Sequence, residues 1–96
     1  MSVYRLTKKA LDDLRSIARY TEKTWGREQR NKYLSKLDSS FRMLAHEPQL
    51  GRACNEIKQG YRKHHVGRHL IFYRLVASRV EIIRILHDSM DVDSHL

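Results

Sequence analysis

The sequence predicts a single α+β domain in which a helical hairpin packs on one face of a mostly antiparallel sheet, in the order β-α-α-β-β-β. Two long stretches in the first half space their apolar residues three and four apart, as amphipathic helices do. Three short runs in the second half are rich in β-branched and aromatic residues, as strands are. The 96 residues leave no length for a second domain, so residues 1–96 are expected to form one.

The chain is expected to begin with a short strand and a long helix. Residues 3–6 alternate weakly between apolar and polar side chains, which indicates a strand. Thr7 then has a side chain suited to the N-cap of a helix, and Gly26 can end that helix in a left-handed conformation. The predicted apolar stripe of this helix is Leu11, Leu14, Ala18, Thr21 and Trp25, with Ile17 beside it.

A second amphipathic helix is expected from about residue 27 to residue 47, with Pro48 just beyond its end. Its apolar face comprises Leu34, Leu37, Phe41 and Leu44. Because the turn between the two helices is so short, they must lie antiparallel. From residue 48 to residue 60 the periodicity is lost, which predicts a loop held by a few contacts of Gly51, Cys54, Asn55 and Ile57.

Three strands are expected to close the chain, at residues 61–65, 69–76 and 80–87. The turns between them centre on Gly67 and on residues 77–79. The unbroken apolar run at residues 70–73 indicates a central strand that is covered on both faces. A helical hairpin returns the chain to the end where it left the sheet, so the strand at 61–65 is expected to run opposite to the first one.

Composition gives the sign of the partner's charge and the expected compartment. Lys and Arg number 19 against 11 Asp and Glu, a formal net charge of +8, which implies an acidic partner, either nucleic acid or protein. The single cysteine, Cys54, fits a reducing compartment, and no apolar leader or membrane-length run is present, so a cytoplasmic protein is expected. His64, His65, His69 and His87 have no Cys or Asp at a supporting spacing, so neither a metal site nor a cofactor is expected.

Several short segments, taken in order, resemble those of ParE toxins, the plasmid-stabilisation toxins of bacteria within the RelE/ParE superfamily. These segments are Trp-Gly-Arg-Glu-Gln at 25–29, Glu-Pro-Gln-Leu-Gly at 47–51, residues 56–63, Phe-Tyr-Arg at 72–74 and Ile-Leu-His-Asp-Ser-Met-Asp at 85–91. The resemblance implies the same fold and the toxin role of a type II toxin–antitoxin system. It further implies that the toxin inhibits DNA gyrase, blocks replication, and is neutralised in a hetero-oligomer with a ParD-like antitoxin.

The alternative enzymatic role is a ribosome-dependent mRNA endonuclease of the RelE kind. Such enzymes place an arginine at the head of the middle strand, where this sequence has Leu70. His69 precedes it but should point to the opposite face, and Arg68 lies roughly 7 Å further along the chain, inside the expected turn. The residues after Leu86 are acidic rather than basic, which would repel RNA. The sequence therefore predicts that the protein is not an enzyme.

Two sets of contact residues are predicted. For the antitoxin, whose C-terminal segment is expected to be acidic and amphipathic, they are Arg62, Lys63, Arg68, Tyr73 and Arg74. For the target they are Trp25, His87 and Met90. Other roles stay open at this point: the basic residues could be a solvated sheet edge, and Trp25 could anchor the helical hairpin. A plain basic nucleic-acid-binding module is the third possible function, although no recognition-helix pattern supports it.

Overall fold

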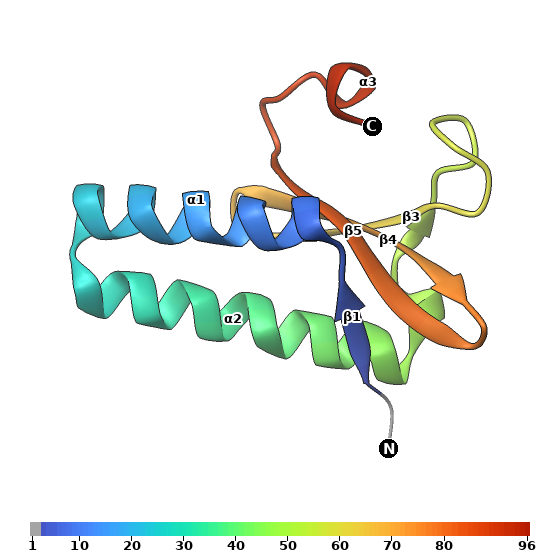
Figure 1. The fold of residues 1–96 in the computed structure, drawn as a ribbon, viewed down its shortest axis with the longest axis horizontal. Helices are drawn as coiled ribbons and strands as arrows, with labels where there is room; N and C mark the ends of the chain where they lie inside the picture. The colour runs from blue at the N-terminus through green and yellow to red at the C-terminus, as the bar shows by residue number, and fades with distance from the viewer. Residues whose placement is uncertain (1–2) are drawn as a thin grey trace.

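A computed structural model describes residues 3–96, and it shows two long helices lying side by side on one face of a five-stranded sheet (Figure 1). The helices are α1 (Lys8–Trp25) and α2 (Arg27–His46), followed by the short 3₁₀ helix η1 (Pro48–Leu50). The strands are β1 (Tyr4–Leu6), β2 (Arg52–Ala53), β3 (Arg62–Val66), β4 (His69–Val76) and β5 (Arg79–His87), and the short helix α3 (Val92–His95) follows them. The predicted α+β fold is confirmed.

The strands are ordered β1-β5-β4-β3-β2, so β4 is central, as its apolar run predicted. All neighbouring pairs are antiparallel except β1 and β5, which are parallel. The predicted direction of the strand at 61–65 was wrong, because β3 runs parallel to β1. The unpredicted strand β2 lies between α2 and β3 in the chain, and it is β2 that runs antiparallel to β3. Its two exposed residues carry no periodic signal that sequence analysis could have found.

The start and end of α1 are fixed by the residues that the sequence predicted. The Oγ1 atom of Thr7 accepts a hydrogen bond from the backbone N–H of Ala10 at 3.0 Å and donates one to the carbonyl of Ile83 at 2.8 Å. Thr7 therefore caps the helix and joins it to β5. Gly26 has φ +95°, a conformation that favours glycine, and its N–H donates to the carbonyl of Glu22.

The predicted apolar stripe of α1 was partly wrong. Its most buried residues are Ala10, Ile17 and Thr21, whereas Leu11 is 39% exposed and Trp25 is 69% exposed. Ala10 is the better contact because its small side chain lets the helix lie close to the sheet. Trp25 continues the buried side of the helix, but the hairpin extends past the end of the sheet and leaves it nothing to pack against (Figure 1).

The sheet buries apolar side chains on both faces. On the helix face, Ile71 and Tyr73 of β4 pack with residues of both helices, including Ile17, Leu37 and Phe41. On the opposite face, Phe72 and Leu86 pack with Cys54 and Tyr61 from the β2–β3 connection. Val92 and Leu96, from α3 and the residue after it, cover the edge of this second cluster. Among residues 3–96 no helix has the length and apolar character needed to cross a bilayer.

Candidate interaction groove

A groove of about 1060 Å³ lies where the helical hairpin extends beyond the sheet. One wall is the side of α1 that carries Ile17, Tyr20 and Trp25, and the floor is formed by the β3–β4 turn and the end of β5. The remaining lining residues are Ser16, Thr21, Gln29, Tyr33, Arg68, His69, His87, Ser89 and Met90. Tyr20 and Trp25 are 68% and 69% exposed, so the groove has large aromatic side chains with little cover.

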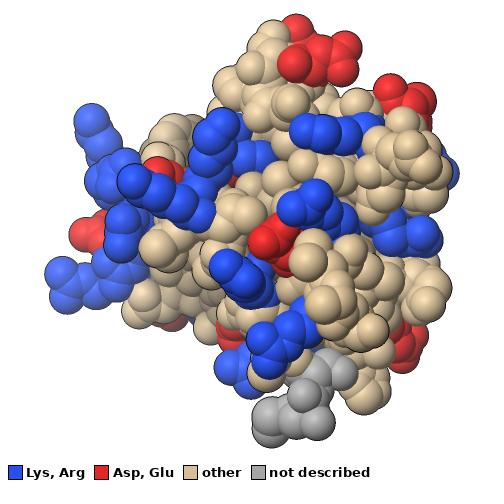
Figure 2. Space-filling view, turned by 45° about the vertical axis from the view of Figure 1, so that its right-hand side comes forward, with Lys and Arg blue, Asp and Glu red and all other residues tan. Residues whose placement is uncertain are grey.

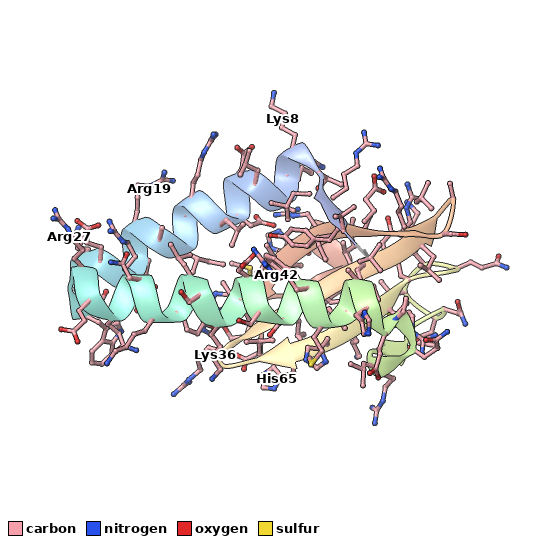
Figure 3. The ribbon with its side chains drawn as sticks, turned by 90° about the horizontal axis from the view of Figure 1, so that it is seen from below. Lys8, Arg19, Arg27, Lys36, Arg42 and His65 are labelled. Carbon is pink, nitrogen blue, oxygen red and sulfur yellow. The ribbon has the colours of Figure 1, made fainter. Side chains whose placement is uncertain are left out.

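Figure 3 shows the hairpin from below, with Arg27 at its tip beyond the end of the sheet. Lys8 and Arg19 point away from the sheet on the outer side of α1. The outer surface of the hairpin is therefore charged, with cations and ion-paired acids such as Asp12, while its inner side supplies the apolar wall of the groove. This division follows from the amphipathic pattern of α1, whose polar residues are left in solvent.

A chain of polar contacts crosses the floor of the groove. The Oη atom of Tyr33 lies 2.6 Å from Nδ1 of His69, and the rings of His69 and His87 meet edge to face with centroids 5.4 Å apart. Nδ1 of His87 in turn lies 2.7 Å from Oγ of Ser89. The register of the sheet produces this contact, because His69 and His87 are opposite each other on β4 and β5.

The pKa of His69 is lowered, mainly because burial penalises the charged ring and secondly because His87 lies beside it. Asp88 and Asp13 act in the opposite direction with smaller effect. Burial also raises the pKa of the Tyr33 hydroxyl. The neutral forms of His69 and Tyr33 are therefore favoured at pH 7.

The three predicted target-contact residues, Trp25, His87 and Met90, all line this groove. Trp25 comes from the end of α1, far in the sequence from His87 at the end of β5 and from Met90, three residues after it. Sequence analysis did not identify Tyr20, Tyr33 or His69 as part of the same surface. The alternation along β4 could have placed His69 on the helix face, but nothing in the pattern indicated that the hairpin would extend past it.

The predicted antitoxin-contact residues do not form one patch. Lys63 and Arg74 lie on the sheet face away from the helices, on β3 and β4. Arg62 instead holds the loop after α2, because its guanidinium donates to the carbonyls of Gly51 and Gln49 at 3.0 and 3.2 Å. Arg68 lies in the β3–β4 turn and belongs to the groove. The exposed surface is nevertheless rich in Lys and Arg, with fewer acids between them (Figure 2).

Tyr73 requires a correction, because its side chain is 0% exposed and can offer no contact surface. Its hydroxyl donates to the carbonyl of Pro48 at 2.6 Å and accepts the N–H of Gly51 at 2.8 Å. The ring packs so closely that a Cβ atom on Gly51 would lie 2.2 Å from the hydroxyl oxygen. Tyr73 is therefore a structural residue that fixes the chain between α2 and β2.

Leu70, which was expected at the position where RelE-like enzymes carry an arginine, faces away from the groove and packs beside Leu86. The residue that enters the groove is its neighbour His69, and Arg68 lies in the turn, as predicted. The groove therefore contains two imidazoles and one guanidinium. Within residues 3–96 no cluster of three or more His, Cys, Asp or Glu side chains is arranged to bind a metal ion.

Comparison with solved structures places the fold. The chain superposes on one from a structure described as "Chromosomal ParDE TA system from P. aeruginosa", with a TM-score of 0.77 and 20% identity, over 91% of this chain and 96% of the other. The two chains therefore share one fold.

Sequence relatives identify the family to which the chain belongs. Residues 4–92 match the family model described as "ParE toxin of type II toxin-antitoxin system, parDE". Toxin ParE1 of Caulobacter vibrioides is 43% identical over 100% of this chain and 99% of its own length. Toxin ParE1 of Mycobacterium tuberculosis is 40% identical over 99% of this chain and 98% of its own length. Toxin ParE of Escherichia coli is 32% identical over 100% of this chain and 94% of its own length. The chain belongs to the ParE toxin family and is a ParE-type toxin of a type II toxin–antitoxin system.

Proposed function

We propose that the free toxin inhibits DNA gyrase, and thereby blocks replication, by binding it through the groove. Membership of the ParE family along almost the whole chain is the observation that carries the proposal. The groove supports it because Trp25 and Met90 are exposed there, and aromatic and methionine side chains are enriched where proteins bind one another. The mechanism needs only occupation of a gyrase surface, without chemistry by the toxin's own side chains.

The decisive experiment measures two activities of the purified toxin, supercoiling by DNA gyrase and protein synthesis in vitro. Supercoiling should stop while translation continues. Trp25→Ala should weaken the inhibition roughly tenfold or more, since an aromatic side chain at the centre of an interface often contributes more than ~1 kcal/mol. Leu11→Ala is the matched control, because Leu11 is an exposed apolar residue of the same helix that does not line the groove. Undiminished supercoiling at saturating toxin would refute the gyrase proposal.

A ribosome-dependent endonuclease is the second candidate, and the two imidazoles beside Arg68 are the observation that favours it. Imidazole pairs can serve as general base and general acid in attack of a ribose hydroxyl on phosphate. An endonuclease would give the reverse result, with translation stopped and supercoiling intact. A plain nucleic-acid-binding module would affect neither assay directly, and its affinity for DNA would fall steeply with salt.

We also propose that a ParD-like antitoxin neutralises the toxin and that an acidic segment of it contacts Lys63 and Arg74. These two cations share the sheet face opposite the helices, and an acidic amphipathic segment could pair with both of them. Arg62 and Arg68 are expected to be secondary contacts, because Arg62 donates to two backbone carbonyls and Arg68 lies at the groove. Arg74 makes a single bond, to Glu81, and its side chain is 46% exposed.

The double variant Lys63→Glu with Arg74→Glu tests this contact. It should weaken binding of the cognate antitoxin several-fold or more, because two attractions become repulsions, and calorimetric titration would measure the change. The double variant Lys8→Glu with Arg19→Glu is matched in charge and lies on the outer side of α1, away from that face. Equal affinities of the two double variants would exclude Lys63 and Arg74 from the interface.

A further inference from the structure

The wall and the floor of the groove differ in polarity. Its α1 wall is apolar and aromatic, whereas its floor ends in Arg68, His69 and His87. The residues that line it include no aspartate or glutamate, and within residues 3–96 no carboxylate forms an ion pair with Arg68. The floor therefore offers hydrogen-bond donors and the positive charge of Arg68. The Asp88 carboxylate approaches the floor at His87, but it does not line the groove and also contacts Nε2 of His65 at 3.2 Å.

The hydrogen bonds around His87 leave one of its ring nitrogens available. The backbone N–H of Ser89 donates to Nδ1 at 3.1 Å, so the proton of the neutral ring is on Nε2. The nearby Asp88 carboxylate also approaches Nδ1, at 3.5 Å, rather than Nε2. His87 therefore keeps an N–H donor that its neighbours in β5 and the following turn do not use. In the same way Tyr33 engages only Nδ1 of His69.

We propose that Arg68, His69 and His87 form a carboxylate subsite, which takes an aspartate or glutamate side chain from a protein segment bound in the groove. The flanking apolar side chains of such a segment would lie against Tyr20, Trp25 and Met90. The inference deepens the proposed target-binding role of the groove by naming what the bound segment must contain. A nucleic acid fits less well, because a phosphate backbone needs a row of cations and only one arginine lines the groove.

Binding of a carboxylate at this subsite must be coupled to proton uptake. The charged and titratable groups around His69 are Asp13 of α1, Tyr33 of α2, Arg68 of the turn, His87 of β5 and Asp88 after it. The Asp13 carboxylate is already bonded to Arg84 and to the N–H of Ile85, and the Asp88 carboxylate contacts His65 and His87. A carboxylate bound at the subsite would add a further negative charge beside the ring. It would stabilise imidazolium at His69, and affinity should rise as pH falls from 7.5 to 6.

The test uses a small probe, 3-phenylpropionate, which combines one carboxylate with one apolar ring, and the isolated full-length toxin. Its neutral match is 3-phenylpropionamide. Proton NMR should show saturable shifts of the His69 and His87 imidazole signals with the carboxylate. Binding should be at least threefold weaker with the amide, and the carboxylate should bind more tightly at pH 6 than at pH 7.5. Arg68→Gln should weaken carboxylate binding at least threefold, whereas Arg79→Gln, on the β4–β5 hairpin tip, should leave it unchanged.

Three outcomes would overturn the subsite: equal binding of acid and amide, equal binding by Arg68→Gln and the unaltered toxin, or tighter binding of inorganic phosphate or a short oligonucleotide than of the carboxylate at the same ionic strength. The last result would make the floor a phosphate site. These outcomes are separate from the proposed function, because the probe requires no gyrase. If the probe binds as expected and supercoiling is unaffected, the subsite stands and gyrase is excluded as the target.

Discussion

At the scale of single residues, Tyr73 shows how a buried side chain can stabilise the fold without offering a contact surface. Its hydroxyl bonds two backbone groups between α2 and β2, and its ring lies in the core. Tyr73→Phe removes only the oxygen and leaves the buried N–H of Gly51 without a partner. We expect a loss of about 1–3 kcal/mol in the free energy of unfolding, measured by urea denaturation.

The control for Tyr73→Phe is Tyr20→Phe, which removes the same atom from an exposed ring and should change stability by less than ~0.5 kcal/mol. Equal stability of the two variants would mean that water replaces the Tyr73 hydroxyl without cost. The antitoxin affinity of Tyr73→Phe should be unchanged under conditions where the variant is folded, because the residue presents no surface.

His69 and His64 make stability depend on pH. The pKa of each is lowered below its ordinary value of 6.5, mainly by burial, so the unfolded chain holds more protons than the folded one near and below that value. Well above pH 6.5 both imidazoles are neutral in the folded and the unfolded chain, so they do not change the free energy of unfolding. As the pH falls through and below 6.5, the unfolded chain takes up protons more readily, and the free energy of unfolding decreases. Urea denaturation should therefore show lower stability at pH 5.5 than at pH 7.5.

The pH dependence should shrink in His69→Gln, which cannot take up the proton, whatever the effect of the substitution on stability at pH 7.5. His46→Gln is the matched control, because His46 is exposed at the end of α2. The same difference between the two pH values in both variants would show that His64 or the carboxylates, and not His69, cause the acid sensitivity.

At the scale of elements, the ion pair of Asp13 and Arg84 joins α1, β5 and the C-terminal segment. The guanidinium makes two bonds to the carboxylate, at 2.8 and 2.9 Å, and a third to the carbonyl of His95 at 3.0 Å. The Arg84 side chain is 16% exposed and the Asp13 side chain is 14% exposed, so both are largely buried. Arg84→Met should cost about 2–4 kcal/mol in urea denaturation, since it leaves a carboxylate buried with one fewer partner.

Arg74→Met is the comparison for Arg84→Met, because the Arg74 side chain is 46% exposed and makes a single bond to Glu81, which is 16% exposed. This pair should therefore contribute less than the pair of Asp13 and Arg84. A loss at Arg84 no larger than at Arg74 would mean that the contacts of Asp13 with the N–H of Ile85 alone hold α1 on the sheet. The C-terminal segment should also loosen in Arg84→Met, which faster amide hydrogen exchange at residues 92–96 would reveal.

The elements were predicted from sequence to the extent that local chemistry specifies them. Thr7, Gly26 and Pro48 mark the ends of the two helices, and the apolar run of β4 marks the central strand. What could not be predicted depends on contacts between distant segments. The two residues of β2 form a strand only because β3 is beside them. Since β2 is antiparallel to β3, the chain reverses once more than predicted, and β3 runs parallel to β1 instead of antiparallel to it.

The candidate site follows the same rule. Trp25, His87 and Met90 were singled out one by one for their side-chain types, and the structure places them around one groove. No spacing in the sequence relates them, because their proximity depends on how far α1 extends past the sheet. Burial of Tyr73 was likewise a property of its position on β4 beneath the loop at Gly51, which hydropathy does not encode.

At the scale of the whole molecule, the net charge of +8 should govern how fast the toxin meets its antitoxin. A surface on which Lys and Arg are widely spread attracts an acidic partner over distances of about one Debye length, ~10 Å at 0.1 M salt (Figure 2). Stopped-flow measurements should show the association rate constant falling roughly tenfold or more between low salt and 0.5 M salt, while the dissociation rate constant changes much less.

Because this attraction arises from the whole surface, single neutralising substitutions remote from the antitoxin interface, such as Lys8→Gln, should lower the association rate slightly and leave dissociation unchanged. Lys63→Gln combined with Arg74→Gln should lower the association rate further and also speed dissociation, since these side chains are proposed to stay in contact in the complex. An association rate that is indifferent to salt would mean that apolar contact limits the encounter, and the charge would then serve some other acidic partner.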